Sequence, residues 1–114
     1  MSFEIWDVVT VPAFPNQEDI HITTTRPCII IEDLQDEVYI CPITSKIHQE
    51  SRYKYCFIVN KDSSEGKQMG LTFDSLIVLD REACLKKIRL HKKMGECPQS
   101  IIDKIEELLH KKKS

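Results

Sequence analysis

The sequence contains little glycine, and it lacks the patterns of secreted and membrane-spanning proteins. Only three glycines occur among 114 residues, which argues against a wholly turn-rich β fold. No stretch approaches the roughly 20 apolar residues that a membrane-spanning helix needs. The N-terminus has neither the basic region nor the apolar core of a signal peptide. We therefore expect a soluble cytoplasmic protein with one domain, which comprises residues 1–114.

The cysteines follow neither a disulfide pattern nor a metal-binding pattern. Their number is odd, no CxxC pair occurs, and three of them lie in apolar, strand-like runs; they are Cys28, Cys41, Cys56, Cys84 and Cys97. We interpret them as reduced and mostly buried thiols. A metal site that joins His48 or His91 to a cysteine lacks the required ligand spacing, so we expect no metal and no other cofactor.

The chain also lacks an excess of positive charge. Its formal net charge is −2, which gives no overall attraction to nucleic acid. Any binding of RNA or DNA must therefore use a local basic patch, or one that a second subunit completes.

The predicted elements are mostly strands, and a helix comes last. Runs rich in β-branched and aromatic residues predict five strands, at 4–11, 20–31, 38–43, 55–59 and 71–79. Polar loops are expected at 12–19, 46–54 and 60–69, and Asp74-Ser75 falls in the middle of the last strand. Residues 80–88 have short helical character, and the segment to Gly95 fits either a helix or a strand.

The C-terminal helix has the clearest pattern. Apolar residues at helical spacing form one face: Ile101, Ile102, Ile105, Leu108 and Leu109. Pro98 suits a helix start, and Ser100 with Asp103 has the spacing of a capping box. Glu107 lies four residues before Lys111, the favourable polarity for an ion pair. The order of elements predicts a mainly β (α+β) fold, a small and strongly bent antiparallel sheet, closed or nearly closed, with this helix packed on one side.

Two strands place chemically useful side chains at their ends. Arg26 stands at the entrance of one, and Pro27 holds it in an extended conformation. Thr44 and Ser45 end the next strand. If the two strands pair as a hairpin, a guanidinium meets two hydroxyls at one edge of the sheet, which suits a phosphodiester.

Structural roles compete with these functional ones. Arg26 could pair with a carboxylate such as Glu37 or Asp74, and Thr44 and Ser45 could cap backbone groups at a strand end. Asp74 could be a buried carboxylate whose hydrogen bonds are satisfied. Trp6 and Phe14 could stack on bases or pack into the core, and His21 and His48 could be surface residues. The basic cluster at 86–93 fits either a phosphate track or a solvated face.

Several stretches, in order along nearly the whole chain, resemble the MazF/PemK family of type II toxin–antitoxin ribonucleases. They lie at 4–9, 25–31, 40–45, 74–80 and 92–95. The Thr-Arg-Pro stretch at 25–27 and the Pro-Ile-Thr-Ser stretch at 42–45 are the most specific part of the resemblance. It implies a small SH3-like β-barrel of the MazF/PemK/CcdB type with a C-terminal helix, assembled as a homodimer.

The resemblance also implies a metal-independent, sequence-specific endoribonuclease that cleaves single-stranded RNA and is inhibited by an antitoxin whose disordered segment occupies the RNA groove. We assign catalysis to Arg26, Thr44 and Ser45. We assign RNA contacts to Phe14, Asn16, Gln17, Lys46, His48 and Asp74. The expected products carry a 2′,3′-cyclic phosphate and a 5′-hydroxyl, and the sequence shows no obvious general base, with His21 and His48 the nearest candidates.

The sequence departs from the family pattern in three places. Phe3 replaces a glycine before the first strand, Ser75 replaces a glutamine, and Ile77 replaces an arginine. The last two changes remove groups that could help hold RNA or order the site. Two alternatives therefore stay open: a degenerate member that binds RNA or a partner without cleavage, and a protein-binding toxin like the DNA-gyrase poison CcdB, whose fold is similar.

Overall fold

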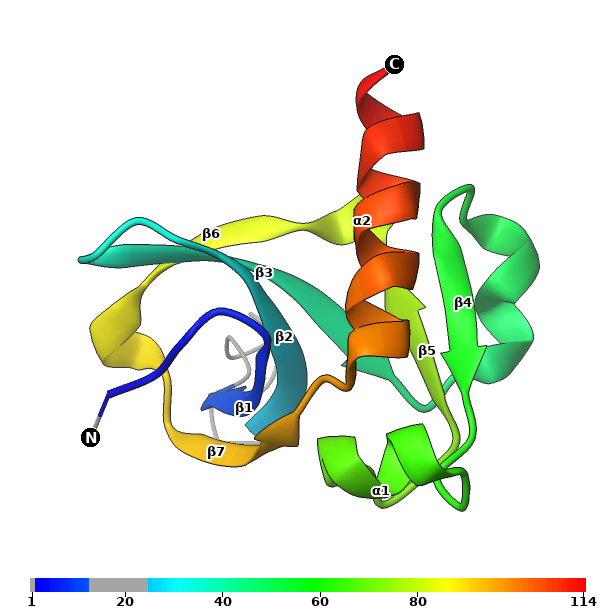
Figure 1. Cartoon of the computed structure of the whole chain (residues 1–114), viewed down its shortest axis with the longest axis horizontal. Coiled ribbons are helices and arrows are strands. Elements are labelled where there is room, and N and C mark those ends of the chain that lie inside the picture. Colours follow the sequence, from blue (N-terminus) through cyan, green and yellow to red (C-terminus); the bar gives the residue numbers. More distant parts are fainter. Residues whose placement is uncertain (1, 13–24) are drawn as a thin grey trace, which may run out of the picture.

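The structure is a computed structural model, and it describes residues 2–12 and 25–114. Its strands are β1 (Asp7–Pro12), β2 (Thr25–Asp33), β3 (Glu37–Thr44), β4 (Cys56–Val59), β5 (Ser75–Val78), β6 (Ala83–Lys86) and β7 (Lys92–Glu96). Its α-helices are α1 (Ser64–Met69) and α2 (Gln99–Lys113), and three 3₁₀ turns are η1 (Ile47–Arg52), η2 (Leu79–Arg81) and η3 (Lys87–Arg89). Figure 1 shows the strands as a bent sheet with α2 beside it.

The described strands form one antiparallel sheet in the order β4-β5-β3-β2-β1-β7, and β6 also pairs with β3. Strand β3 is shared between partners, because its first half pairs with β6 and its end pairs with β5. The expected bent, mainly antiparallel sheet with a C-terminal helix is confirmed. The described strands do not close into a full barrel, since β4 and β7 end the strand order.

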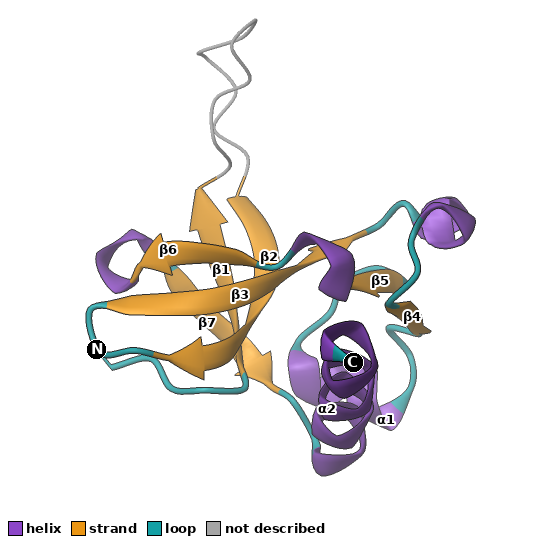
Figure 2. Ribbon diagram, turned by 90° about the horizontal axis from the view of Figure 1, so that it is seen from above, coloured by secondary structure: helices purple, strands orange, loops and turns teal. Residues whose placement is uncertain are grey.

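Apolar side chains cover both faces of the central strands. Neighbouring residues of a strand point to opposite faces, so Val8 and Ile29 join one core while Val9 and Ile30 join the other. The larger core also contains Ile105 of α2, which is fully buried. Figure 2 shows α2 end-on beside β4 and β5, with α1 next to it. The apolar face of α2 thus packs within the chain.

Helix α1 occupies a segment that the sequence predicted to be a loop. The Ser63 side chain accepts a hydrogen bond from the Gly66 backbone N–H at 3.0 Å, which caps the helix start. Gly70 ends the helix with a φ of 75°, in the left-handed region that favours glycine. The loop prediction was wrong because six residues are too short to show a helical period.

Residues 83–86 form strand β6, where the sequence predicted helical character. Glu37 pairs with Lys86 and Ile40 pairs with Ala83, so β6 completes the edge of β3 that β5 leaves open. Residues 80–81 belong to η2, and the ambiguous segment before Gly95 forms η3 and most of β7. A long-range partner, rather than local spacing, decides the conformation here.

Smaller differences concern element ends. Strand β1 begins at Asp7 rather than at residue 4, because Trp6 adopts a φ of 72° in a turn. Strand β5 begins at Ser75, so Asp74 precedes the strand. The proposed capping box is wrong: no side chain caps α2, and Gln99 donates to Asp103 instead, at 2.8 Å.

The interpretation of the cysteines as mostly buried free thiols is confirmed. All five are free, and Cys28, Cys41 and Cys97 are buried. Burial raises the pKa of the Cys28 and Cys97 thiols to about 12 and raises the pKa of the Cys41 thiol well above its usual value. These thiols are therefore neutral parts of the core. Among the described residues, no helix is long and apolar enough to span a membrane.

Candidate functional site

The pairing of β2 with β3 brings Arg26 close to Thr44. The antiparallel register places Cys28 opposite Pro42, so that Arg26, two residues before Cys28, and Thr44, two residues after Pro42, lie at the same end of the strand pair. Both side chains, together with Ser45 and Lys46, line a cavity of about 520 Å³. The structure therefore gathers four of the residues that the sequence singled out.

All the charged side chains among the described residues that line this cavity are cationic. Four cationic side chains line it, Arg26, Lys46, Arg52 and Arg81, and none of the described residues that line it is a carboxylate. None of the four makes an ion pair within the described residues, where the ion pairs involve Lys87, Lys93, Lys111 and Lys112. A chain with a formal net charge of −2 thus has a concave, locally basic surface. Such a surface attracts anions.

The carboxylates that the sequence offered as partners of Arg26 have other contacts. The Asp74 Oδ1 accepts a hydrogen bond from the Lys61 backbone N–H at 3.1 Å. The Glu37 carboxylate accepts one from the Cys84 thiol at 3.3 Å. Arg26 itself is exposed. The structural role considered for Arg26, an ion pair with Glu37 or Asp74, is not found among the described residues.

Thr44 has a structural bond and retains a free donor. Its Oγ1 accepts a hydrogen bond from the Lys46 backbone N–H at 3.2 Å, which holds the turn after β3. A hydroxyl is also a donor, and this bond does not use its hydrogen. Thr44 can therefore fix the turn and donate to an anion in the cavity at the same time.

Arg52, Tyr53 and Arg81 are cavity residues that the sequence analysis missed. The Arg81 guanidinium lies over the Tyr53 ring, 5.5 Å from its centroid. Arg52 and Tyr53 come from a segment that was predicted to be a loop, and Arg81 from one predicted to be helical. The sequence did contain a signal for Arg81 as a site residue. Asp80-Arg81 directly follows an apolar run that predicts a strand, as Thr44-Ser45 does.

Other sequence-assigned residues lie elsewhere. His48 is exposed on η1 and does not line the cavity. Asp74 does not line it either, and its bond to Lys61 supports the structural role. Phe14, Asn16 and Gln17, and the candidate base His21, lie outside the described residues. Trp6 is half-buried and packs against the larger core.

The two departures at Ser75 and Ile77 affect the core rather than the cavity. Both side chains are fully buried. The Ser75 Oγ donates to the Phe73 carbonyl at 2.9 Å, and Ile77 pairs with Ile43 of β3. The expectation that these changes remove RNA-holding groups is therefore not supported. In this fold the polar side chains that follow β5 are those of Asp80 and Arg81.

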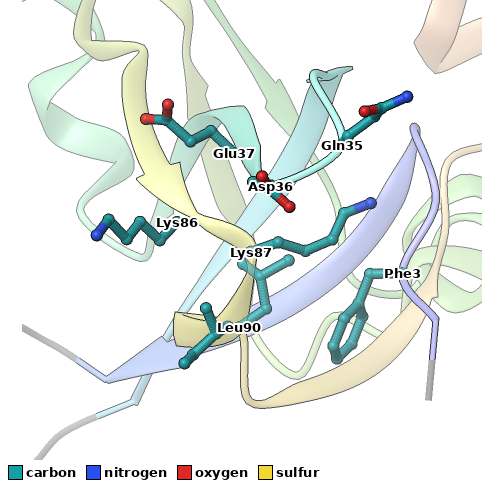
Figure 3. A pocket seen from close by; sticks show the side chains of 8 residues that line it. Phe3, Gln35, Asp36, Glu37, Lys86, Lys87 and Leu90 are labelled. Atoms are coloured by element: carbon teal, nitrogen blue, oxygen red, sulfur yellow. The ribbon is translucent and has the colours of Figure 1, made fainter.

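A second cavity of about 780 Å³ has a different character. Its lining comes from the chain start, the β2–β3 turn, β6 and η3: Phe3, Gln35, Asp36, Glu37, Lys86, Lys87, Ile88 and Leu90. Figure 3 shows acidic and basic side chains together around it. Lys87 pairs with Asp33 at 2.9 Å, and their hydrogen bond lowers the pKa of the Asp33 carboxyl. Mixed charges make this cavity a weaker anion site.

The rest of the basic cluster at 86–93 is solvated and partly neutralised. Lys93 lies 2.6 Å from Glu96 and 3.4 Å from the buried carboxylate of Asp7. The hydrogen bond to Glu96 raises the pKa of Lys93. These contacts favour a solvated face over a phosphate track. Among the described residues, no group of three or more His, Cys, Asp or Glu side chains is placed to hold a metal ion.

A family comparison decides the classification. A sequence model of the family described as PemK-like, MazF-like toxin of type II toxin-antitoxin system matches residues 4–112. The chain belongs to this family. A comparison with curated proteins finds no significant match.

Solved structures support the PemK/MazF-like fold. One of them is an endoribonuclease in complex with its cognate antitoxin from Mycobacterial species. It matches with a TM-score of 0.63 at 15% identity, over 97% of this chain and 93% of that chain. At this identity the likeness concerns the fold.

Proposed function

We propose that this PemK/MazF-like toxin is a metal-independent endoribonuclease that cleaves single-stranded RNA at short specific sequences. The observation that carries the proposal is the cavity at the ends of β2 and β3, where four cations meet the hydroxyls of Thr44 and Ser45 and no described carboxylate is present. Such a lining suits a phosphodiester, because arginine pairs with phosphate oxygens and hydroxyls donate to them.

RNA brings its own nucleophile, the 2′-hydroxyl. The enzyme must align this group with the phosphorus, accept its proton and stabilise the charge that develops on the phosphate. In our proposal Arg26 binds the scissile phosphate and stabilises that charge. Thr44 positions the phosphate through its free hydroxyl hydrogen, and Ser45 supports it. The 2′-oxygen bonds to phosphorus, the 5′-oxygen leaves, and the products carry a 2′,3′-cyclic phosphate and a 5′-hydroxyl.

The proton acceptor is not assigned to a described cavity residue. Among the described residues, neither a histidine nor a carboxylate lines the cavity. His48 does not reach the lining, and His21 lies outside the described residues. Lys46, which is exposed at the cavity, contributes to RNA binding in our proposal, as do Phe14, Asn16 and Gln17 on the segment after β1.

The proposed partners follow from the family. The solved endoribonuclease with a similar fold is held with its cognate antitoxin, and we propose that this toxin likewise has a cognate antitoxin, in the cytoplasm. An antitoxin segment that carries carboxylates would complement the basic cavity. We also propose a homodimer, in which a second copy extends the RNA-binding surface.

The test is a cleavage assay with purified, antitoxin-free protein and a long single-stranded RNA in excess EDTA. We expect cuts at a repeated short motif, with 5′-hydroxyl ends that a polynucleotide kinase can label without prior phosphatase treatment. Cleavage that EDTA abolishes would contradict metal independence. Intact RNA that remains bound would indicate the non-cleaving alternative, and unbound RNA together with inhibited DNA supercoiling would indicate a gyrase poison.

A further inference from the structure

The two residues before Arg81 on η2 are held by contacts from two other parts of the chain. The Asp80 carboxylate accepts hydrogen bonds from the backbone N–H groups of Tyr55 and Lys54, at 2.8 and 3.0 Å. The Leu79 N–H donates to the Tyr55 carbonyl at 2.9 Å. Lys112 of α2 donates to the Leu79 carbonyl, also at 2.9 Å. These bonds fix the turn at Leu79 and Asp80, directly before Arg81.

The guanidinium of Arg81 is itself oriented. It lies 5.5 Å from the centroid of the Tyr53 ring, a distance typical of cation–π stacking. Stacking leaves the edge of the guanidinium, with its donors, free to bind. Arg81 is exposed, lines the cavity and makes no ion pair within the described residues. The stacking thus offsets part of the free-energy cost of ordering this long side chain before a ligand binds.

One phosphodiester group cannot neutralise the positive charge of this cavity. A phosphodiester carries a single negative charge, whereas this space is lined by four cations that make no ion pair with another described residue. Arg26 lies at the start of β2 and Lys46 just after β3, while Arg52 and Arg81 lie on η1 and η2, so the cations fall into two groups by the elements that carry them. A chain of consecutive phosphates would neutralise both groups, which a single anion would not.

We propose that Arg81, braced by Tyr53 and assisted by Arg52, forms a second phosphate subsite that binds a phosphate flanking the one at Arg26. This inference rests on the proposed function, because it takes RNA as the ligand. Arg81 acts here in binding and alignment rather than in bond making, so its loss should raise KM more than it lowers kcat. The subsite would make the toxin select substrates that extend beyond the cleaved dinucleotide.

The experiment is a double-mutant cycle between protein and RNA. The probe is a short RNA that contains the cleavage motif, with a single 2′-deoxy sugar at the cut position so that binding is measured without turnover. In a series of such RNAs, one phosphate at a time is replaced by an uncharged methylphosphonate. Each is bound to the parent, to Arg81→Gln and to the matched control Lys86→Gln, which removes an exposed cation from the other cavity.

We expect one flanking methylphosphonate to weaken binding to the parent by about tenfold, and to weaken binding to Arg81→Gln by less than about twofold. Arg81→Gln should also lower the slope of log K against log salt by about 0.7 to 1. Lys86→Gln should behave as the parent. Tyr53→Phe, which keeps the ring, should retain the coupling, whereas Tyr53→Leu should weaken it.

Equal losses for the parent and Arg81→Gln at every phosphate would overturn the subsite, even if the RNA is cleaved normally. Conversely, an all-ribose RNA could be bound but never cleaved, while one of its phosphates shows coupling to Arg81. That result would support the subsite and overturn the nuclease activity. RNA that the parent does not bind would overturn both. Circular dichroism of each variant, compared with the parent, separates these outcomes from misfolding.

Discussion

Replacing Arg26 by alanine is expected to lower the rate constant of RNA cleavage by a factor of about 10² to 10³, because the scissile phosphate loses a preorganised charged donor. The fold should be unaffected, since the Arg26 side chain is exposed and makes no ion pair within the described residues. Single-turnover kinetics with a labelled RNA at saturating protein measure the chemical step directly.

The matched control for Arg26→Ala is Lys86→Ala, which removes a cation from the mixed-charge cavity shown in Figure 3. It should cleave at the parent's rate. Arg26→Lys should recover only part of the loss, because an ammonium cannot reproduce the planar fork of donors. An Arg26→Ala protein that cleaves as fast as the parent would remove Arg26 from the mechanism.

Introducing arginine at position 77 is expected to prevent folding. The family resemblance places an arginine at this position, whereas the structure buries Ile77 completely between Ile43 and Phe57. An unpaired buried charge costs several kcal/mol, a large part of the roughly 5–15 kcal/mol that stabilises a typical domain. Ile77→Arg should show no cooperative thermal transition by circular dichroism.

The control for Ile77→Arg is Ile58→Arg on the neighbouring strand. Ile58 is 45% exposed, so its arginine can reach water. This variant should keep a cooperative transition within a few degrees of the parent's Tm, since surface substitutions usually change stability by less than about 0.5 kcal/mol. If Ile77→Arg melts like the parent, position 77 faces solvent and the placement of β5 is wrong.

The meeting of Arg26 and Thr44 in one cavity was predictable because its signals are local. Pro27 fixes an extended backbone beside Arg26, and an acidic turn separates two strongly β-forming runs. Pairing across a short turn then determines the register. The C-terminal helix was equally readable, since its apolar face repeats over several turns and buries Ile101 and Ile105. The predicted capping box of this helix was wrong, because Gln99 rather than Ser100 bonds to Asp103.

The contribution of Arg81 could not be predicted from local pattern. Residues 80–88 have the composition of a short helix, yet β3 extends beyond β5 and offers an edge that residues 83–86 fill. That long-range pairing, together with the bonds to Asp80, directs Arg81 to the cavity. Long-range packing also decides the places of Ser75 and Ile77. The motif suggested that these two positions had lost RNA contacts, but both lie on β5, a strand that is buried throughout.

The most direct test of the central claim concerns the 2′-hydroxyl at the cut site. Two RNAs that differ only in one sugar, ribose or 2′-deoxyribose at the mapped cut position, are incubated with the protein in excess EDTA. The proposed chemistry predicts that the ribose RNA is cut there to a 2′,3′-cyclic phosphate, while the deoxy RNA is bound but stays intact at that position. Cutting of both RNAs at the same phosphodiester would contradict the account.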